Sequence, residues 1–385
     1  MKRFATSRYT FGVEERRSSW LNHYVVTIMS DLDVRHGQGC ETVEIPEDQI
    51  YDITIIGGGP VGLFAAFYGG LRGARTKIIE SLEELGGALT AIYPEKYIFD
   101  IAGFPKVLAK DYVEGAVEQA MSMGCDVHLR TEVTALHKDE ESNVYVLGTA
   151  TGEQHYTRTL IICAGIGAFE PKRLEVDGIG RFENGGGVHY FAKRTEDFRD
   201  KDVLIVGGGD SAVDWASTLL PIAKSVRVIH RSKFRAHEHQ VQALLDGPCN
   251  VHFPDYAVKA VHGNGRLEQV TFGNLKTHEE QTVSVDELIV AIGFVADLGP
   301  LKQWGFDIER NTIRVDPITM ATNFPGIYGA GDIITYPAKF KLIATGAAEA
   351  VTAVNHCVTY YDPTARLDPG HSTNIMEKKD KAARS

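Results

Sequence analysis

Three glycines lie at the spacing that a dinucleotide-binding turn requires. Gly57, Gly59 and Gly62 follow a short apolar, β-branched run, and Glu80 stands 23 residues after the first glycine (80 − 57 = 23). The first glycine permits a tight turn, the second lets a pyrophosphate approach the backbone, and the third lets helix and strand pack closely. Amides at the helix N-terminus would face the phosphate, and the carboxylate would bind ribose hydroxyls. This spacing favours a nucleotide site over an ordinary glycine-rich turn.

A second glycine turn begins 150 residues later (207 − 57 = 150), with basic residues at the ribose position. The offset that leads from Gly57 to Glu80 leads from Gly207 to His230 (207 + 23 = 230), and two arginines follow. A carboxylate would repel a ribose 2′-phosphate, whereas arginine binds it bidentately. We therefore predict an unphosphorylated ribose at the first turn and NADP(H) at the second, rather than a solvated run of charge. The predicted NADP(H) contacts are Gly207, Gly209, Asp210, Ser211, Ala212, His230, Arg231 and Arg235, with Lys233 as a further candidate.

Each turn needs a buried strand before it and a helix after it, and the sequence supplies both. Apolar runs at 53–56 and 203–206 predict the strands, and helical patterns follow each turn. We also expect helices at Lys110–Met123 and Thr345–His356, and strands at Asp126–Leu129, Val133–His137, Val144–Leu147, Gln154–Arg158 and Thr159–Cys163. This order predicts an α/β protein with two Rossmann-like, three-layer dinucleotide-binding domains, the second inserted into the first.

Glycine crossings at 164–167 and near Gly293 set the predicted domain boundaries. The first domain is expected at 51–166 and 296–370, and the second at 167–295. Residues 1–50 lack a clear periodicity, so we expect a flexible N-terminal extension there. Residues 371–385 form a separate C-terminal segment and tail.

Bulk composition limits the classes of partner and compartment. A length of 385 residues suits two domains, and a net charge of −11 argues against nucleic acid or anionic membrane as the main partner. No apolar run is long enough to span a bilayer. The five cysteines are scattered, the closest pair being 38 residues apart (163 − 125 = 38), which favours a reducing cytoplasm. His237 and His239 do not share a helix face and have no evident third ligand, so we expect no metal site.

Two Rossmann units joined by glycine crossings, with a late GAGD turn at 329–332, resemble the two-dinucleotide-binding flavoprotein family over residues 51–376. The resemblance implies that the first unit holds FAD and that Asp332 binds its ribitol phosphate region. It also implies that the helix near Thr345 points its N-terminal amides at the flavin's pyrimidine edge. The helix dipole there favours the negative charge that forms on reduction.

The compact second unit is similar to that of the low-molecular-weight thioredoxin reductases, but their redox CxxC is absent. The corresponding segment 187–194 reads GVHYFAKR, and residues 85–89 after the first turn read LGGAL. Disulfide reduction needs a dithiol that passes electrons on by exchange, so we expect the chemistry to end at the flavin. Local sequences instead resemble the thioredoxin-reductase-like ferredoxin–NADP⁺ reductases at 91–96, 99–105, 165–171, 208–215, 336–339 and, most strongly, 369–373.

In that subgroup the C-terminal extension crosses to the partner subunit and covers one face of the flavin, so the resemblance implies a homodimer. Tyr93 and His371 would stack on opposite flavin faces, and Ser372 would lie near N5, with no protein acid or base required. The implied FAD contacts are Gly57, Gly59, Pro60, Gly62, Glu80, Gly87, Leu89, Tyr93, Val133, Phe169, Asp332, Thr345 and Ser372.

The implied reaction is hydride exchange between NADP(H) and flavin N5, with single-electron exchange with ferredoxin. An acidic ferredoxin would need a local basic face, for which Lys339, Lys341 and the 378–384 tail are candidates. Two alternatives stay open. One is a flavin-dependent NADPH reductase of another acceptor, such as a thioredoxin-like dithiol protein, a quinone or a small molecule. The other is a non-catalytic dinucleotide-binding sensor.

Overall fold

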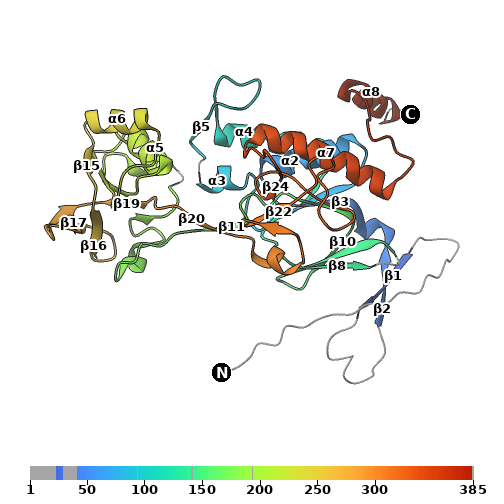
Figure 1. The fold of residues 1–385 in the computed structure, drawn as a ribbon, viewed down its shortest axis with the longest axis horizontal. Coiled ribbons are helices and arrows are strands. Elements are labelled where there is room, and N and C mark those ends of the chain that lie inside the picture. Colours follow the sequence, from blue (N-terminus) through green and yellow to red (C-terminus); the bar gives the residue numbers. More distant parts are fainter. Residues whose placement is uncertain (1–22, 29–40, 93, 140–141, 193, 384–385) are drawn as a thin grey trace. The chain divides into compact units, whose positions relative to one another are not determined.

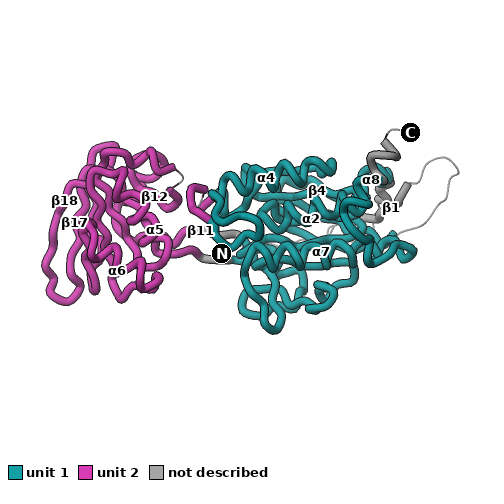
Figure 2. Tube along the Cα trace, turned by 90° about the horizontal axis from the view of Figure 1, so that it is seen from above, with its two compact units in different colours: residues 1–90, 98–168, 297–385 teal, residues 91–97, 169–296 magenta. Residues whose placement is uncertain are grey.

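The chain divides into two compact α/β units. The computed structural model describes residues 23–28, 41–92, 94–139, 142–192 and 194–383 (Figure 1). The first unit comprises residues 1–90, 98–168 and 297–385, and the second comprises residues 91–97 and 169–296 (Figure 2). The second unit is thus inserted into the first, and the predicted fold class is confirmed. Segment 91–97 belongs to the second unit, although we predicted it within the first domain.

Parallel strands form the centre of the first unit. Their order is β7 (Asp126–His128), β4 (Thr76–Ile79), β3 (Ile50–Ile56), β10 (Gln154–Ile162) and β23 (Ile327–Gly329). Strands β3 and β4 are rich in isoleucine and largely buried, as expected for a parallel sheet covered on both faces. Helix α2 (Pro60–Leu71) packs against α4 (Ala109–Met121) and α7 (Ile343–Tyr361), and all three share one hydrophobic core with the strands.

An antiparallel meander adjoins this sheet. It consists of β8 (Val133–Asp139), β9 (Val144–Thr149) and the first part of β10. We predicted two strands at Gln154–Arg158 and Thr159–Cys163, and this prediction is wrong. β10 is a single strand that pairs with β3 from Tyr156 to Ile162 while its other neighbour changes from β9 to β23.

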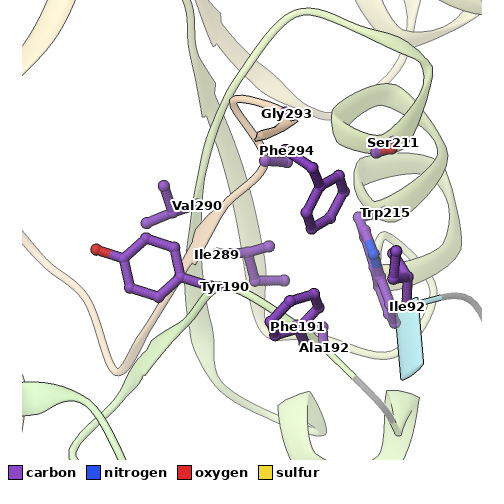
Figure 3. Close-up of a pocket in the computed structure, with 11 residues that line it drawn as sticks. Ile92, Tyr190, Phe191, Ala192, Ser211, Trp215, Ile289, Val290, Gly293 and Phe294 are labelled. Carbon is purple, nitrogen blue, oxygen red and sulfur yellow. The ribbon is translucent and has the colours of Figure 1, made fainter. Parts of the chain in front are cut away.

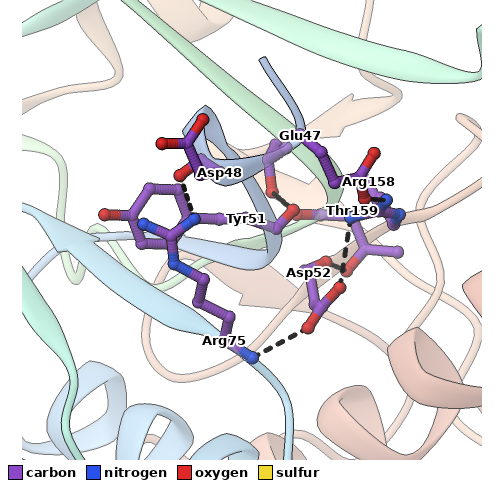
Figure 4. Close-up of polar contacts among 8 residues, drawn as sticks. Glu47, Asp48, Tyr51, Asp52, Arg75, Arg158 and Thr159 are labelled. Atoms are coloured by element: carbon purple, nitrogen blue, oxygen red, sulfur yellow. Dashed lines mark hydrogen bonds and ion pairs between the residues drawn. The ribbon is translucent and has the colours of Figure 1, made fainter. Parts of the chain in front are cut away.

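Polar contacts hold the amino ends of these strands in register (Figure 4). The carboxylate of Asp52 accepts the backbone N–H of Arg75 at 2.8 Å and pairs with Arg158 at 3.3 Å. Arg158 also pairs with Glu47, and the hydroxyl of Thr159 donates to the carbonyl of Asp52 at 2.6 Å. These contacts link β3, β4 and β10 near their amino ends. They therefore also align the carboxyl ends of these strands, where the glycine turn lies.

The second unit repeats this plan. Its parallel strands have the order β12 (Val188–His189), β19 (Glu287–Val290), β13 (Asp202–Val206), β14 (Ser225–Ile229) and β15 (Asn250–His252). Helices α5 (Asp210–Leu219) and α6 (Glu238–Asp246) belong to the same unit. An antiparallel meander of β16 (Tyr256–His262), β17 (Gln269–Asn274) and β18 (Glu280–Ser284) completes the unit. The duplication seen in the glycine turns therefore extends to the topology of the whole unit.

The chain leaves and re-enters the first unit through two neighbouring strands. β11 (Ala168–Pro171) and β20 (Phe294–Asp297) form a two-stranded sheet. Gly167, just before β11, has φ of +81°, and a methyl group there would lie 2.2 Å from the carbonyl oxygen of Asp297. Glycine is therefore required at this crossing.

Smaller elements complete the description. β1 (His23–Ile28) and β2 (Glu41–Pro46) form an antiparallel pair within the predicted N-terminal extension, most of which lies outside the described residues. Helix α8 (Ser372–Ala383) forms the C-terminal segment. Among the described helices, none has the length and apolar character needed to cross a membrane. The other short elements are α3 (Ala88–Ile92), β5 (Tyr97–Ile98), β6 (Val107–Leu108), β21 (Ile308–Glu309), β22 (Thr312–Arg314), β24 (Ile334–Thr335) and 3-10 turns at 47–49, 179–182, 195–198 and 299–303.

Candidate dinucleotide-binding sites

The first glycine turn joins β3 to α2 and leaves an open space beside its second glycine. A methyl group added at Gly57, where φ is +106°, would lie 2.4 Å from a backbone carbonyl oxygen just after β10. One at Gly62 would lie 1.9 Å from the carbonyl oxygen of Gly57. One at Gly59 would meet nothing nearer than the Cα of Gly87, at 3.9 Å. The turn thus offers free space beside the N-terminus of α2, which begins at Pro60, and a pyrophosphate fits such a cradle.

Glu80 is fixed beside this turn at the end of β4. Its side chain is 6% exposed, and Oε2 accepts the N–H of Gly58 at 2.7 Å. Oε1 accepts the N–H of Leu82 at 2.9 Å and the hydroxyl of Ser81 at 3.3 Å. A carboxylate has about four acceptor positions, so the anchored group can still accept a hydrogen bond from a ribose hydroxyl.

The Asp332 turn packs against the first turns of α2 and α7. Gly331, with φ of +85°, precedes Asp332, and its N–H donates to Oε2 of Glu349 at 2.9 Å. A methyl group at Gly346 in α7 would lie 2.4 Å from Val61 in α2 and 3.4 Å from the Cα of Gly331. Three segments far apart in the sequence therefore meet beside the first glycine turn.

A buried ion pair supports the Asp332 turn. The side chains of Lys339 and Glu349 are 5% and 4% exposed, and Nζ lies 2.6 and 2.8 Å from the two carboxylate oxygens. The hydroxyl of Tyr336 also donates to this carboxylate at 2.6 Å. Burial, together with this hydrogen bond, raises the pKa of Tyr336 to about 12, so the phenol keeps its proton. The prediction that Lys339 lies on an exposed basic face for ferredoxin is therefore wrong, because its ammonium group is buried and paired.

The second glycine turn joins β13 to α5, and its glycines have the same roles as those of the first turn. A methyl group at Gly207, where φ is +153°, would lie 2.2 Å from the carbonyl oxygen of Ala291. One at Gly209 would meet no protein atom within 4 Å. Ala212 occupies the third position, in α5, and is fully buried. The cradle at Gly209 therefore matches the one at Gly59.

His230 lies against the second turn, at the end of β14. A methyl group at Gly208 would lie 2.2 Å from its imidazole ring, and Nε2 is 3.0 Å from the hydroxyl of Ser232 and 3.2 Å from the carbonyl of Lys233. Burial lowers the pKa of His230, and nearby arginine charges add to this effect, so the ring is neutral. The ring therefore supports the loop 231–235 from inside. The side chains that the loop exposes are those of Arg231, Ser232, Lys233 and Arg235.

An aromatic pocket lies within the second unit, next to the first turn of α5 (Figure 3). The rings of Phe191 and Phe294 stack with centroids 5.5 Å apart and planes at 20°. This pocket was not predicted from the sequence, although the adjacent aromatic residues Tyr190 and Phe191 were an available signal. The lining residues are Ile92, Tyr190, Phe191, Ala192, Ser211, Trp215, Ile289, Val290, Ala291, Gly293 and Phe294.

The other predicted contacts are distributed over several elements. Leu89 lies in α3, and Val133 begins β8, where it is buried. The hydroxyl of Thr345 donates to carbonyl groups before α7, so its backbone amide is the group left for a ligand. Tyr93 lies outside the described residues, as does the side chain of Phe169.

The C-terminal segment is attached at the end of α2 that is remote from the glycine turn. Arg72, which follows α2, donates hydrogen bonds to the carbonyls of Arg366 at 2.8 Å and Leu367 at 3.1 Å. A helix of 12 residues is about 18 Å long. His371 and Ser372 are exposed at the start of α8. The tail of this chain therefore begins at the opposite end of α2 from its own predicted FAD cradle.

Residues 51–356 match the family model described as pyridine nucleotide-disulphide oxidoreductase. The chain belongs to this family. A ferredoxin–NADP reductase of Halalkalibacterium halodurans is 51% identical over 332 residues, which is 86% of this chain and 99% of the relative. One from Geobacillus kaustophilus is 49% identical over 337 residues, covering 87% of this chain and all of the relative. These matches confirm the resemblance to the ferredoxin–NADP⁺ reductases of the family.

Solved thioredoxin reductases have the same fold. The thioredoxin reductase of Lactococcus lactis has a TM-score of 0.67 at 25% identity, covering 80% of this chain and 98% of that one. The thioredoxin reductase of T. acidophilum has a TM-score of 0.67 at 24% identity, covering 82% of this chain and 100% of that one.

The thiols in the described part of the chain are poorly suited to disulfide exchange. Cys125, Cys163, Cys249 and Cys357 are unpaired, and all but Cys249 are buried. Burial raises the pKa of Cys125 and Cys249 to about 11, and raises those of Cys163 and Cys357 further. Since the thiolate is the reactive form, these side chains are inert at neutral pH.

Proposed function

We propose that this protein is an FAD-dependent ferredoxin–NADP⁺ reductase. The observation that carries the proposal is the charge difference between two otherwise matching glycine turns. Glu80 occupies the ribose position of the first turn, and a loop with Arg231 and Arg235 follows the second. An enzyme that uses both FAD and NADPH needs one site of each kind. Relatives at 51% and 49% identity, named as ferredoxin–NADP reductases, support ferredoxin as the electron partner.

FAD is assigned to the first unit. The amides at the start of α2 would face its pyrophosphate in the cradle beside Gly59, and Glu80 would accept its ribose hydroxyls. Asp332 would bind the ribitol phosphate region, and the amides near Thr345 would stabilise negative charge at the ring. FAD bound there would supply the redox chemistry, which is hydride exchange with nicotinamide and single-electron exchange with ferredoxin.

NADP(H) is assigned to the second unit. The N-terminus of α5, with Asp210 and Ser211 in its first turn, would bind the pyrophosphate beside Gly209. Arg231 and Arg235 would bind the 2′-phosphate because guanidinium groups match phosphate geometry. His230 would act through the loop: its neutral ring packs against Gly208 and holds the segment that carries the arginines.

A homodimer completes each site in this proposal. His371 from the partner chain would cover one face of the flavin, Tyr93 the other, and Ser372 would lie near N5. The attachment of the tail at the remote end of α2 supports this assignment, because it separates the tail's origin from the cradle of its own chain. These residues exclude water and orient the rings, and none of them has to act as an acid or base.

A thioredoxin-like dithiol protein is the second candidate acceptor. The fold shared with thioredoxin reductases favours it. The absence of a CxxC in the sequence and the raised pKa values of the described thiols argue against it. We therefore favour the one-electron acceptor, and a reducing cytoplasm as the place of reaction.

The test is a reconstituted electron-transfer assay with the purified full chain. We expect bound FAD in its absorbance spectrum, bleaching by NADPH, and cytochrome c reduction that depends on added ferredoxin. A protein without flavin would overturn every catalytic assignment. Ferredoxin-independent transfer to thioredoxin, measured by insulin reduction, would instead support the dithiol acceptor.

A further inference from the structure

Two histidines and a glutamate converge within the first unit, and none of them belongs to the predicted nucleotide contacts. Oε1 of Glu153 lies 3.8 Å from Nε2 of His155 and 4.0 Å from Nδ1 of His128. All three potential ligand atoms lie within 4.8 Å of one another. Around a tetrahedral Zn²⁺ with ligand distances of about 2.0–2.1 Å, neighbouring ligand atoms stand about 3.3 Å apart. The three side chains therefore need to close by only about an ångström to enclose an ion.

His155 supplies a second, independent observation that points to a ligand. Its side chain is 4% exposed, and its Nε2 is buried without a hydrogen-bond partner. The distance of 3.8 Å to Glu153 is too long for a hydrogen bond. A buried polar atom without a partner is costly and is uncommon in folded proteins. A metal ion would satisfy this nitrogen and would also explain why it faces a carboxylate and a second imidazole.

From these contacts we infer that His128, Glu153 and His155 form a binding site for a divalent transition-metal ion of the Zn²⁺ type. Two imidazole nitrogens and one carboxylate oxygen are a donor set that such ions prefer. The site opens to solvent, since His128 is 34% and Glu153 53% exposed, so an ion can enter and keep a water ligand. We predicted no metal from the sequence and missed this group, because His128 ends β7 whereas Glu153 and His155 lie at the start of β10.

The charge around the site is compatible with a cation. The carboxylate of Glu153 would face the ion beside the two imidazoles, and carboxylate and imidazole are ligands that Zn²⁺ prefers. Burial lowers the pKa of Lys77 to about 7, which reduces the positive charge near the site. The Lys77 side chain lies over the ring of Tyr51, 4.2 Å from its centroid.

The proposed ion would connect two parts of the first unit. His128 ends β7, whereas Glu153 and His155 lie at the turn that leads from β9 into β10. The rings of His128 and His155 already touch edge to face, with centroids 4.6 Å apart. The carbonyl of His128 also accepts the N–H of Glu80 at 2.8 Å. Metal binding would thus brace the strand ends beside Glu80, whatever reaction the protein catalyses.

The experiment is a Zn²⁺ titration of the chelator-treated full chain by isothermal calorimetry, with thermal unfolding as a second readout. We expect one Zn²⁺ per chain and a rise in unfolding temperature on binding. His128→Asn changes a partly exposed residue and should keep the fold, yet weaken binding by about tenfold or more. His155→Gln should act in the same way. The matched control, His237→Ala with His239→Ala, removes a histidine pair outside the site, with ring centroids 6.0 Å apart, and should bind like the wild type.

Three results would overturn the inference. The first is the absence of saturable Zn²⁺ binding in the wild type. The second is wild-type affinity in His128→Asn. The third is loss of binding in the His237/His239 control but not in His128→Asn. A Co²⁺ titration adds a spectroscopic check, because a protein-bound ion of low coordination number gives visible absorption bands that His128→Asn should abolish.

Discussion

Replacing Gly209 by alanine tests whether the second glycine turn binds the pyrophosphate of NADPH. Gly209 has φ of −93° and ψ of 179°, an extended conformation that alanine adopts without strain. A methyl group there would meet no protein atom within 4 Å. The free energy of unfolding should therefore stay unchanged or rise by about 0.5 kcal/mol, because alanine restricts the unfolded chain.

The expected loss of binding follows from the same geometry. The methyl group would occupy the space assigned to the pyrophosphate, and overpacking of this kind costs about 1–3 kcal/mol. At about 1.4 kcal/mol for each factor of ten, kcat/KM should fall about 5- to 150-fold. NADPH and NADH should be affected equally, because both carry the pyrophosphate. Flavin absorbance should not change, since FAD is assigned to the other turn.

Steady-state kinetics with both coenzymes and urea unfolding measure these effects. Gly207→Ala is the matched control: its methyl group would lie 2.2 Å from the carbonyl oxygen of Ala291, so this variant should lose stability. Wild-type kcat/KM in Gly209→Ala would refute the pyrophosphate assignment. A loss confined to NADPH would refute it as well, because that result would point to the 2′-phosphate.

Three further predictions follow from particular contacts. Arg231→Ala should raise the KM for NADPH by about tenfold or more, which corresponds to the free energy of a charge-assisted hydrogen bond. The KM for NADH should stay nearly unchanged. Equal effects on both coenzymes in steady-state assays would contradict the role of Arg231. Glu349→Gln should lower the free energy of unfolding by about 3–5 kcal/mol in urea, because it leaves the buried charge of Lys339 without its partner; a loss below about 1 kcal/mol would argue against the ion pair as a support. Between pH 7 and 10 an unfolded lysine keeps its proton, whereas Lys77, with its pKa lowered to about 7, loses it. The free energy of unfolding should therefore rise with pH, by up to about 1.4 kcal/mol per unit; Lys77→Met should flatten this slope, and an identical slope in both proteins would disprove the shift.

The features that could be predicted from the sequence are those with a local physical cause. The glycine turns were predictable because close backbone contacts at Gly57, Gly62 and Gly207 exclude any side chain. The difference between Glu80 and His230 could be read from one fixed offset in each unit. Fold class and family resemblance followed from the repetition of this pattern, and both are confirmed.

The features that sequence reasoning missed depend on contacts between distant segments. The single strand β10 was divided at Arg158 because nothing in its residues indicates that its neighbour changes along its length. Lys339 looked like a surface charge because its partner, Glu349, comes from the interior of α7. In the His128–Glu153–His155 group, the two histidines are 27 residues apart (155 − 128 = 27), beyond the reach of a local motif.

The crossing at Gly167 has a consequence for how such a chain could arise. The carbonyl of Asp297 lies so close to Gly167 that no side chain fits between them, so the longer inserted segment, 169–296, begins and ends at nearly one point. A gene segment encoding the second unit could therefore enter or leave at a single surface turn without disturbing the order of strands in the host sheet. Excising residues 169–296 and closing the gap with a short turn would leave the host unit with only the short segment 91–97 of the second unit. Nucleotide specificity could thus be exchanged as a cassette, by transplanting a whole unit between related chains.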